Sequence, residues 1–392
     1  MRARPEWARW PEAARDWTLG VEEEVMLLDP GSWNLAQTID DVLPALSPRL
    51  AGRVSAETHA AALELATGVH VTVAAAVCEL AALRSALQAE LRPLGHAVAV
   101  AGTHPLARAG DILVASGARQ RVVYESMREL ARREPTFALH VHVGVAGPEA
   151  ALDLANRLRA HVPLLLALSA NSPYWRGSDS GLASARTPLF GAFPRVGIPR
   201  RFGGYDDWVS CVATLIDAGA FPEPTFLWWD VRLQPRLGTV EVRVMDAQTS
   251  LRDVAALVAL VQAVARLERE ERYAPEALLD APEVLEENRF LAARDGIDAR
   301  FVMPGSRGRV PAREAARALV VAARPHAAAL GCARELELVE ELAAAAPAER
   351  QRALGRGAGG LASVVQAASA AFARPLGPPE RRGVPVGVPA AG

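Results

Sequence analysis

The stretch Thr18-Leu-Gly-Val-Glu-Glu-Glu-Val-Met-Leu-Leu28 places three glutamates in the middle of a strongly apolar strand pattern. Successive side chains of a β-strand point to opposite faces of its sheet. We therefore expect Glu22 and Glu24 to share one face and Glu23 to lie on the other face with the valines. One interpretation is an exposed edge strand whose charges simply prevent aggregation. Charges in mid-strand, between strong strand formers, favour a metal-binding or catalytic role.

A second strand pattern, Leu139-His-Val-His-Val-Gly-Val145, places His140 and His142 on one face. Zinc hydrolases use this spacing, but a single His-x-His pair is a weak signal, because backbone-bonded histidines are about as common. The other polar candidates are carboxylates rather than further histidines or cysteines. This composition favours Mg²⁺ or Mn²⁺ over a transition metal bound by nitrogen and sulfur.

Leu63-Glu-Leu65 places Glu64 alone among apolar residues. A carboxylate in such surroundings is unfavourable unless a cation or a hydrogen-bond donor meets it. Glu57, seven residues earlier, either belongs to the same site or caps a loop. The pattern leaves both interpretations of Glu57 open.

A third strand pattern, Gly238-Thr-Val-Glu-Val-Arg-Val244, places Glu241 and Arg243 on one face. The pair could form no more than a salt bridge. Two neighbouring features make a binding role more attractive: the stretch Trp228-Trp-Asp-Val-Arg232 and the polar loop Asn171-Ser-Pro-Tyr-Trp-Arg-Gly-Ser178. The loop continues to Arg186-Thr-Pro-Leu-Phe190. Its arginines, hydroxyls and aromatic side chains suit a small anionic ligand.

Composition excludes several classes of protein. The chain has 392 residues and a formal charge of −2, which gives no indication of a nucleic-acid or anionic-membrane partner. All 43 basic residues are arginine, so lysine-dependent Walker-type and kinase-type ATP sites are excluded. Cys78, Cys211 and Cys332 are far apart, which predicts buried, unbridged thiols. We find no signal peptide and no apolar run long enough to span a bilayer, and so predict a cytoplasmic protein.

The order of the predicted elements favours the α+β class. Residues 226–234 and 239–246 flank Pro235-Arg-Leu-Gly238, which predicts a hairpin and hence an antiparallel sheet. No GxGxxG follows the first strand, so a dinucleotide-binding fold has no support. The expected strands are 18–28, 60–67, 97–102, 138–145, 225–234 and 239–246. The expected helices are 73–91, 121–132, 148–170, 206–218, 251–272, 281–295, 311–323, 333–345 and 360–372.

We expect one catalytic domain. It covers residues 17–373 and has a helical C-terminal portion, because the pattern from Pro275 onward is almost wholly helical. Residues 1–16 are expected to form an N-terminal extension. Residues 374–392, rich in proline and glycine, are expected to form a disordered tail.

Taken together, these segments resemble the type 2 glutamate–cysteine ligase family, in particular its bacterial carboxylate–amine ligases. The resemblance covers about residues 17 to 370 and rests on eight segments in the family's order. They are Thr-Leu-Gly-Val-Glu-Glu-Glu (18–24), Leu-Glu-Leu-Ala-Thr-Gly-Val (63–69), Ala-Gly-Thr-His-Pro (101–105), His-Val-His-Val-Gly-Val (140–145), Ala-Asn-Ser-Pro-Tyr-Trp-Arg-Gly-Ser-Asp-Ser-Gly (170–181), Trp-Trp-Asp-Val-Arg (228–232), Gly-Thr-Val-Glu-Val-Arg (238–243) and Glu-Asn-Arg-Phe-Leu-Ala-Ala-Arg-Asp-Gly-Ile-Asp-Ala (287–299).

The resemblance implies a curved, mainly antiparallel sheet with helices on one side, related to glutamine synthetase, whose concave face binds ATP and Mg²⁺. Such enzymes phosphorylate a carboxylate, here the γ-carboxylate of glutamate, and an amine then displaces the phosphate. The implied activity is that of glutamate–cysteine ligase, in thiol biosynthesis of the glutathione type. The implied partners are small molecules, namely glutamate or a similar carboxylate and cysteine or another amine. A homodimer is also considered.

The family's residue roles are assigned here to the positions of this chain that match its motifs. The resemblance implies Mg²⁺ or Mn²⁺ ligands at Glu22, Glu24 and Glu64, with His142 and Glu241 as further members of the metal shell. Glu241 and Arg243 are the implied catalytic residues, with Arg243 at the phosphoryl group. The implied contacts to nucleotide or substrate are Arg176, Arg232, Asn288 and Arg294. Glu23, Glu57 and His140 are left unassigned.

Two other functions remain open at this stage. A metal-dependent hydrolase built on His140, His142 and the glutamates would bind a transition metal tightly and would not need ATP. A non-catalytic relative would bind nucleotide or metal for regulation. Loss of Glu24, Glu241 or Arg243 would favour the non-catalytic relative, and all three are present.

Overall fold

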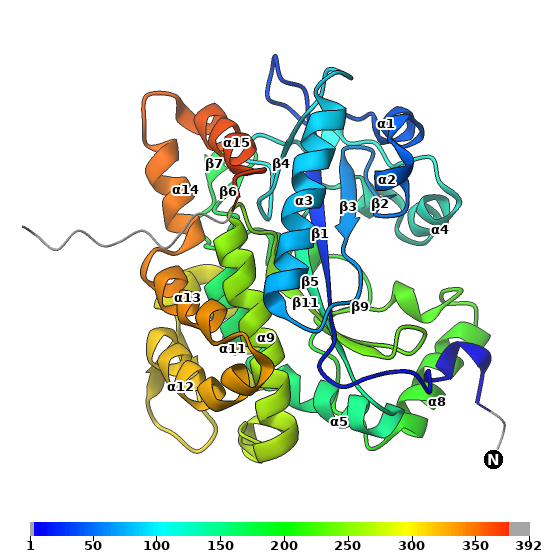
Figure 1. The fold of residues 1–392 in the computed structure, drawn as a ribbon, viewed down its shortest axis with the longest axis vertical. Coiled ribbons are helices and arrows are strands. Elements are labelled where there is room, and N and C mark those ends of the chain that lie inside the picture. Colours follow the sequence, from blue (N-terminus) through cyan, green and yellow to red (C-terminus); the bar gives the residue numbers. More distant parts are fainter. Residues whose placement is uncertain (1–3, 376–392) are drawn as a thin grey trace, which may run out of the picture.

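The computed structural model describes residues 4–375, and within them a seven-stranded sheet forms the centre of the molecule (Figure 1). The strands follow the order β10-β11-β5-β1-β3-β2, and β4 also pairs with β1. Every pairing in this sheet is antiparallel. The strands are β1 Leu19–Leu28, β2 Val54–Ala56, β3 Ala62–Ala66, β4 Ala97–Ala99, β5 Ala138–Gly144, β10 Val231–Gln234 and β11 Thr239–Asp246.

Three short two-stranded pairings lie outside this sheet in the described part of the chain. The first and third are antiparallel, and the second is parallel. They are β6 Tyr174–Trp175 with β7 Ser178–Asp179, β8 Val196–Gly197 with β9 Trp228–Trp229, and β12 Arg300–Val302 with β13 Arg309–Pro311.

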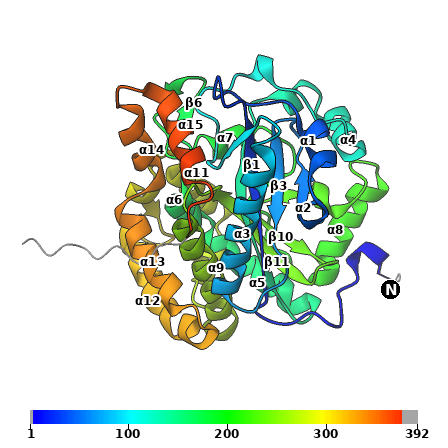
Figure 2. The ribbon, with the colours of Figure 1, turned by 45° about the horizontal axis from the view of Figure 1, so that its top comes forward.

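Helices pack on the face of the sheet that carries the apolar residues of β1. Helix α3 contacts β1 and β3, α9 contacts β5, and α5 contacts β10 and β11. Figures 1 and 2 show helices α12 to α15 along one flank of the molecule, where α12 and α13 pack on α9. The helices are α1 Ile39–Ala45, α2 Pro48–Ala51, α3 Val73–Leu91, α4 Ala118–Met127, α5 Pro148–Leu158, α6 Val162–Ser169, α7 Arg186–Phe190, α8 Tyr205–Asp217, α9 Leu251–Glu271, α10 Glu276–Leu279, α11 Pro282–Asp295, α12 Ala312–Leu330, α13 Ala333–Ala344, α14 Pro347–Gly355 and α15 Gly360–Ala371.

Strand β1 shows the predicted alternation. Leu19, Val21, Glu23 and Val25 are buried, while the side chains between them are partly exposed. The position of Glu23 on the apolar face is explained by Arg84 of α3, which donates two hydrogen bonds to its carboxylate. The opposite face is therefore free to carry Glu22 and Glu24.

The predicted α+β class with a mainly antiparallel sheet is confirmed, and the turn at 235–238 does join β10 and β11. Other expectations were wrong. The expected strand 225–234 breaks into a 3₁₀ turn, β9 and β10, because β9 pairs with β8 and β10 with β11. The expected helix 148–170 is interrupted before α6, where Pro163 has no N–H to donate. Helix α12 instead continues through Pro325 to Leu330.

Some expectations reach beyond this description. One hydrophobic cluster runs from Ala8 to Phe372, but the boundaries at residues 16 and 373 stay predictions. The disordered tail expected at 374–392 lies almost wholly outside the described residues. Cys332 is buried, whereas Cys78 is exposed, so burial of all three thiols was a wrong prediction. Among residues 4–375, the helices are too short or too polar to cross a membrane.

Candidate active site

The register of the sheet brings the polar side chains of five strands together on the face opposite α3. Glu24 of β1 lies across from Glu64 of β3, and Glu22 lies across from His140 of β5. Glu241 of β11 lies across from both His142 of β5 and Arg232 of β10. Residues from four distant parts of the sequence thus form one polar row across the sheet.

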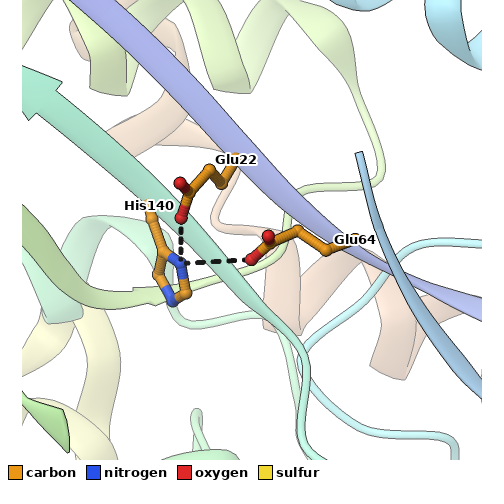
Figure 3. Close-up of side chains that lie close together, drawn as sticks. All are labelled: Glu22, Glu64 and His140. Carbon is orange, nitrogen blue, oxygen red and sulfur yellow. Dashed lines mark hydrogen bonds and ion pairs between the residues drawn. The ribbon is translucent and has the colours of Figure 1, made fainter. Parts of the chain in front are cut away.

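The imidazoles lie between the carboxylates. His140 Nδ1 is 3.2 Å from a Glu22 oxygen and 3.9 Å from a Glu64 oxygen (Figure 3). His142 Nε2 is 3.1 Å from the other Glu22 oxygen. His140 Nε2 is buried and has no hydrogen-bond partner among the described residues.

Three overlapping groups offer ligand atoms within 4.8 Å of one another. The first is Glu22, Glu64 and His140, the second is Glu22, His142 and Glu241, and the third is Glu24, Glu57 and Glu64. Five of these seven residues were predicted as members of the metal shell from the family resemblance, namely Glu22, Glu24, Glu64, His142 and Glu241. His140 and Glu57, which the sequence left unassigned, lie in the same cluster.

The carboxylates carry more negative charge than their surroundings neutralise. Burial and the nearby charge of Glu57 raise the pKa of Glu24 to about 8. Burial, together with the charges of Glu22, Glu57 and Glu24, raises the pKa of Glu64 well above its ordinary value. Carboxylate oxygens in such a group, with the free nitrogen of His140, form a donor set that fits a divalent cation such as Mg²⁺ or Mn²⁺.

Glu22 behaves differently because it faces the imidazoles. Burial opposes its ionisation, but the charge of His142 and hydrogen bonds with both imidazoles outweigh this and lower the pKa of Glu22. The pKa of His142 is raised, since attraction to Glu22 and Glu241 outweighs burial. Burial and the charge of Arg243 lower the pKa of His140 to about 4, which keeps this imidazole neutral near pH 7.

Glu241 holds two arginines at the end of the row. Its carboxylate accepts two hydrogen bonds from Arg232, at 2.8 and 3.0 Å, and one from Gln234 at 2.8 Å. Arg243 donates a fourth. Burial opposes ionisation of Glu241, but the charges of Arg232 and Arg243 hold its pKa well below the ordinary value. The buried Nε of Arg243 has no partner within the part of the chain that the structure describes.

A cavity of about 300 Å³ lies beside this row, and its walls include Glu22, Glu24, Glu57, Glu64, His140, Arg232 and Arg243. The sequence patterns assigned no role to several of its walls, which come from the short strands β2 and β9, from α4, and from the segments beside them. They are Ser55, Thr58, Arg119, Gln120, Thr225 and Trp228. Trp228 belongs to a stretch that the sequence had singled out, whereas Arg119 carries no pattern of its own.

Three predicted contact residues lie elsewhere. Arg176 binds Glu134, and Arg294 binds Asp295. The side-chain amide of Asn288 donates to the backbone oxygen of Val302 and accepts from its backbone N–H. Of the four predicted contact residues, the described cavity walls include Arg232 alone. Arg176, Asn288 and Arg294 are not among the described cavity walls, and their polar groups bond other residues.

Solved structures define the class of fold. The chain superimposes on a glutamate–cysteine ligase from Francisella tularensis, solved in complex with AMP, with a TM-score of 0.68 and 15% sequence identity. The superposition covers 93% of this chain and 90% of that one. The architecture is thus that of a glutamate–cysteine ligase.

Sequence comparison identifies the family. The sequence model of Glutamate-cysteine ligase family 2 matches residues 18–367. Two Rubrobacter xylanophilus proteins, provisionally named glutamate–cysteine ligases 2-1 and 2-3, are 42% and 41% identical to this chain. The matches cover 89% and 90% of this chain and 93% and 96% of those proteins. The chain belongs to glutamate–cysteine ligase family 2, as the sequence patterns predicted.

Proposed function

We propose that the protein is an ATP- and Mg²⁺-dependent carboxylate–amine ligase. It activates a carboxylate, that of the glutamate side chain, as an acyl phosphate and joins it to an amine such as cysteine. Family membership supports the ligase class. The observation that supports the chemistry is one cavity whose walls combine four carboxylates and His140 with Arg232 and Arg243.

The carboxylates and imidazoles are the proposed metal shell. Glu22, Glu24, Glu64 and His142 keep the roles that the family implies, and His140 and Glu57 join them by position. Mg²⁺ in this shell would draw together phosphate oxygens and reduce their charge repulsion. Glu241 is proposed to share this shell only in part, because two arginines and Gln234 already occupy its lone pairs.

Arg243 is the proposed catalytic contact to the transferring phosphoryl group. It lines the cavity, and its free Nε–H is available to a phosphate oxygen. The substrate carboxylate oxygen attacks the γ-phosphorus, the bond to the bridging oxygen breaks, and ADP leaves. The amine nitrogen then attacks the acyl carbon, the carbon–oxygen bond breaks, and the amine loses a proton as inorganic phosphate departs.

Carboxylates outnumber imidazoles in the cluster, which disfavours the hydrolase alternative, because transition-metal hydrolases rely mainly on nitrogen ligands. The deciding experiment measures ADP release from ATP with Mg²⁺ and glutamate, with and without cysteine, and then with a panel of amino acids and amines. Release that requires a carboxylate and an amine together is the expected result. Hydrolytic turnover without ATP, or nucleotide binding without turnover for any pair, would refute the proposed function.

A further inference from the structure

A second, smaller cavity opens from the one that holds the carboxylates. Its volume is about 70 Å³, and it shares Glu24, Glu57, Trp228 and Arg243 with the larger cavity. Its own walls are four apolar side chains together with Arg186, His59 and Thr136. We call Ala62, Met127, Phe190 and Phe193, together with Arg186, the apolar annex.

Arg186 offers one free hydrogen-bond donor to the annex. Its terminal nitrogens donate to the backbone oxygens of Val244, at 2.9 Å, and Arg243, at 3.2 Å. The side chain is only 5% exposed, yet its Nε has no partner among residues 4–375. A buried N–H without a partner is unfavourable. The annex therefore suits a ligand that brings an oxygen, preferably an anionic one, to this atom.

Asp246, at the end of β11, helps to fix the position of Arg186. Asp246 accepts hydrogen bonds from the hydroxyls of Ser172, at 2.6 Å, and Ser184, at 2.9 Å. These contacts hold the segment that leads into α7. Gly102 allows the close approach, since a Cβ at this position would lie 2.6 Å from the Asp246 carboxylate. Arg186 and Phe190 are thus carried by a rigid support rather than by a free loop.

The shared walls identify what the annex can hold. A group in the annex contacts Glu24 and Glu57, which belong to the proposed metal shell. In ATP the adenine is separated from the γ-phosphate by the ribose and two phosphates, so it would lie further away. The annex occupant is therefore one of the two substrates that react at the phosphoryl group.

Charge and shape separate these two substrates. Glutamate carries two carboxylates and an ammonium group, which need the polar walls of the larger cavity, such as Arg119, Gln120 and Thr225. The annex offers the free Nε–H of Arg186 beside apolar side chains, and the free Nε–H of Arg243 lies at the border that it shares with the larger cavity. A cavity needs about 10–15 Å³ of this kind of volume to hold one water molecule. The annex therefore accommodates only a group of a few heavy atoms.

We propose that the apolar annex is the subsite for the amine substrate, and that it selects an α-amino acid with a small apolar side chain. Phe190, Phe193 and Met127 contact the side chain, and Arg186 Nε–H binds the carboxylate. The inference rests on the proposed ligase function and specifies its amine substrate.

The experiment compares amines that differ only in size or only in the carboxylate. ADP release is measured with ATP, Mg²⁺ and glutamate, using valine, phenylalanine and valinamide as amines, and hydroxylamine as an amine too small to need the annex. In the unsubstituted protein kcat/KM for valine should exceed that for phenylalanine and for valinamide by about tenfold or more.

Substitutions test the two halves of the annex separately. Phe193→Ala should raise the phenylalanine-to-valine ratio of kcat/KM by about tenfold, because it enlarges the apolar wall. Arg186→Gln should bring valine and valinamide close to equal use and weaken valine binding in calorimetry with ADP and Mg²⁺. Phe290→Ala, at an exposed position of α11, is the matched control and should leave both ratios unchanged.

Each outcome decides between the two proposals. Turnover with hydroxylamine, combined with ratios that Phe193→Ala and Arg186→Gln do not change, would overturn the annex assignment and leave the ligase function standing. The same holds if valinamide is used as well as valine by the unsubstituted protein. No ADP release with any amine, hydroxylamine included, would overturn both.

Discussion

Glu241 is saturated with hydrogen bonds before any ligand arrives. A carboxylate has about four lone-pair positions, and Arg232, Gln234 and Arg243 fill them. A metal ion at Glu241 would have to displace one of these donors. Glu64 differs, because burial and the surrounding carboxylates raise its pKa and no arginine neutralises it directly. The two glutamates are thus expected to serve different purposes.

Glu241→Gln should reduce kcat by about 100-fold or more, since Arg243 loses the anion that aims it at the phosphoryl group. The Mg²⁺ concentration for half-maximal rate should change less than in Glu64→Gln, where a proposed metal ligand is lost. Steady-state rates across a Mg²⁺ titration measure both quantities, with Glu283→Gln on α11 as control. A near-normal rate would rule out any catalytic role for Glu241, and a Mg²⁺ shift as large as that of Glu64→Gln would make it a true metal ligand.

At the scale of elements, the buried pair Glu23–Arg84 joins strand β1 to helix α3. Arg84 also donates to the backbone oxygens of Gln248, Thr249 and Phe372, so one side chain connects the sheet, the segment before α9 and the end of α15. Both members of the pair are fully buried. Removal of one member therefore leaves a buried charge without compensation.

Arg84→Leu is expected to lower the free energy of unfolding by about 3–5 kcal/mol, the usual result of breaking a buried ion pair from one side. The double variant Glu23→Leu/Arg84→Leu should lose less, because it leaves no unpaired charge. Urea denaturation of both variants measures the difference, with Arg92→Leu at the exposed end of α3 as control. Equal destabilisation of the single and double variants would show that packing, not charge, is the role of Arg84.

His104 connects two loops through a neutral imidazole. Its Nε2 donates to the backbone oxygen of Trp33 at 2.9 Å, and its Nδ1 accepts from the N–H of Leu106 at 3.2 Å. Protonation would remove the acceptor. Burial also disfavours the charged form and lowers the pKa of His104 to about 4.

The sign of the pH effect follows from this lowered pKa. Between about pH 6.5 and 4 the unfolded chain binds a proton at His104 that the folded protein does not, so stability is lost as the pH falls. The contribution is about 1.4 kcal/mol per pH unit. Urea denaturation in EDTA should show that His104→Gln reduces the slope of unfolding free energy against pH in this range. An unchanged slope in His104→Gln would contradict the assignment.

Across the whole molecule, the sequence predicted what depends on local periodicity. The alternation in β1, β5 and β11 placed Glu22, Glu24, His142 and Glu241 on one face, and the structure brings them together. The sequence could not show whether His140 belongs to the site or only bonds the backbone, and it could not assign Glu57 to the site. It also could not find Arg119, since α4 reaches the cavity only through tertiary packing. Asn288 and Arg294 were chosen by resemblance, and Arg176 by resemblance and by its polar loop; the described cavity walls include none of the three.

The proposed metal shell draws most of its ligands from β1, β3 and β5 and thus requires the folded sheet. An ion that binds only the folded state raises the free energy of unfolding by RT ln(1 + [L]/Kd), about 2.7 kcal/mol at 100 times Kd. Mg²⁺ should therefore stabilise the protein in urea denaturation, and EDTA should reverse the effect.

Glu64→Gln separates metal binding from a general effect of salt. Without metal this variant should be more stable than the unsubstituted protein, because it removes one member of a group of mutually repelling carboxylates. With saturating Mg²⁺ the order should reverse, since the variant has lost a ligand and gains less from the ion. Glu283→Gln should follow the unsubstituted protein under both conditions. Stability curves that do not cross, or that respond equally to Na⁺ at matched ionic strength, would show that the carboxylate cluster is not a divalent-metal site.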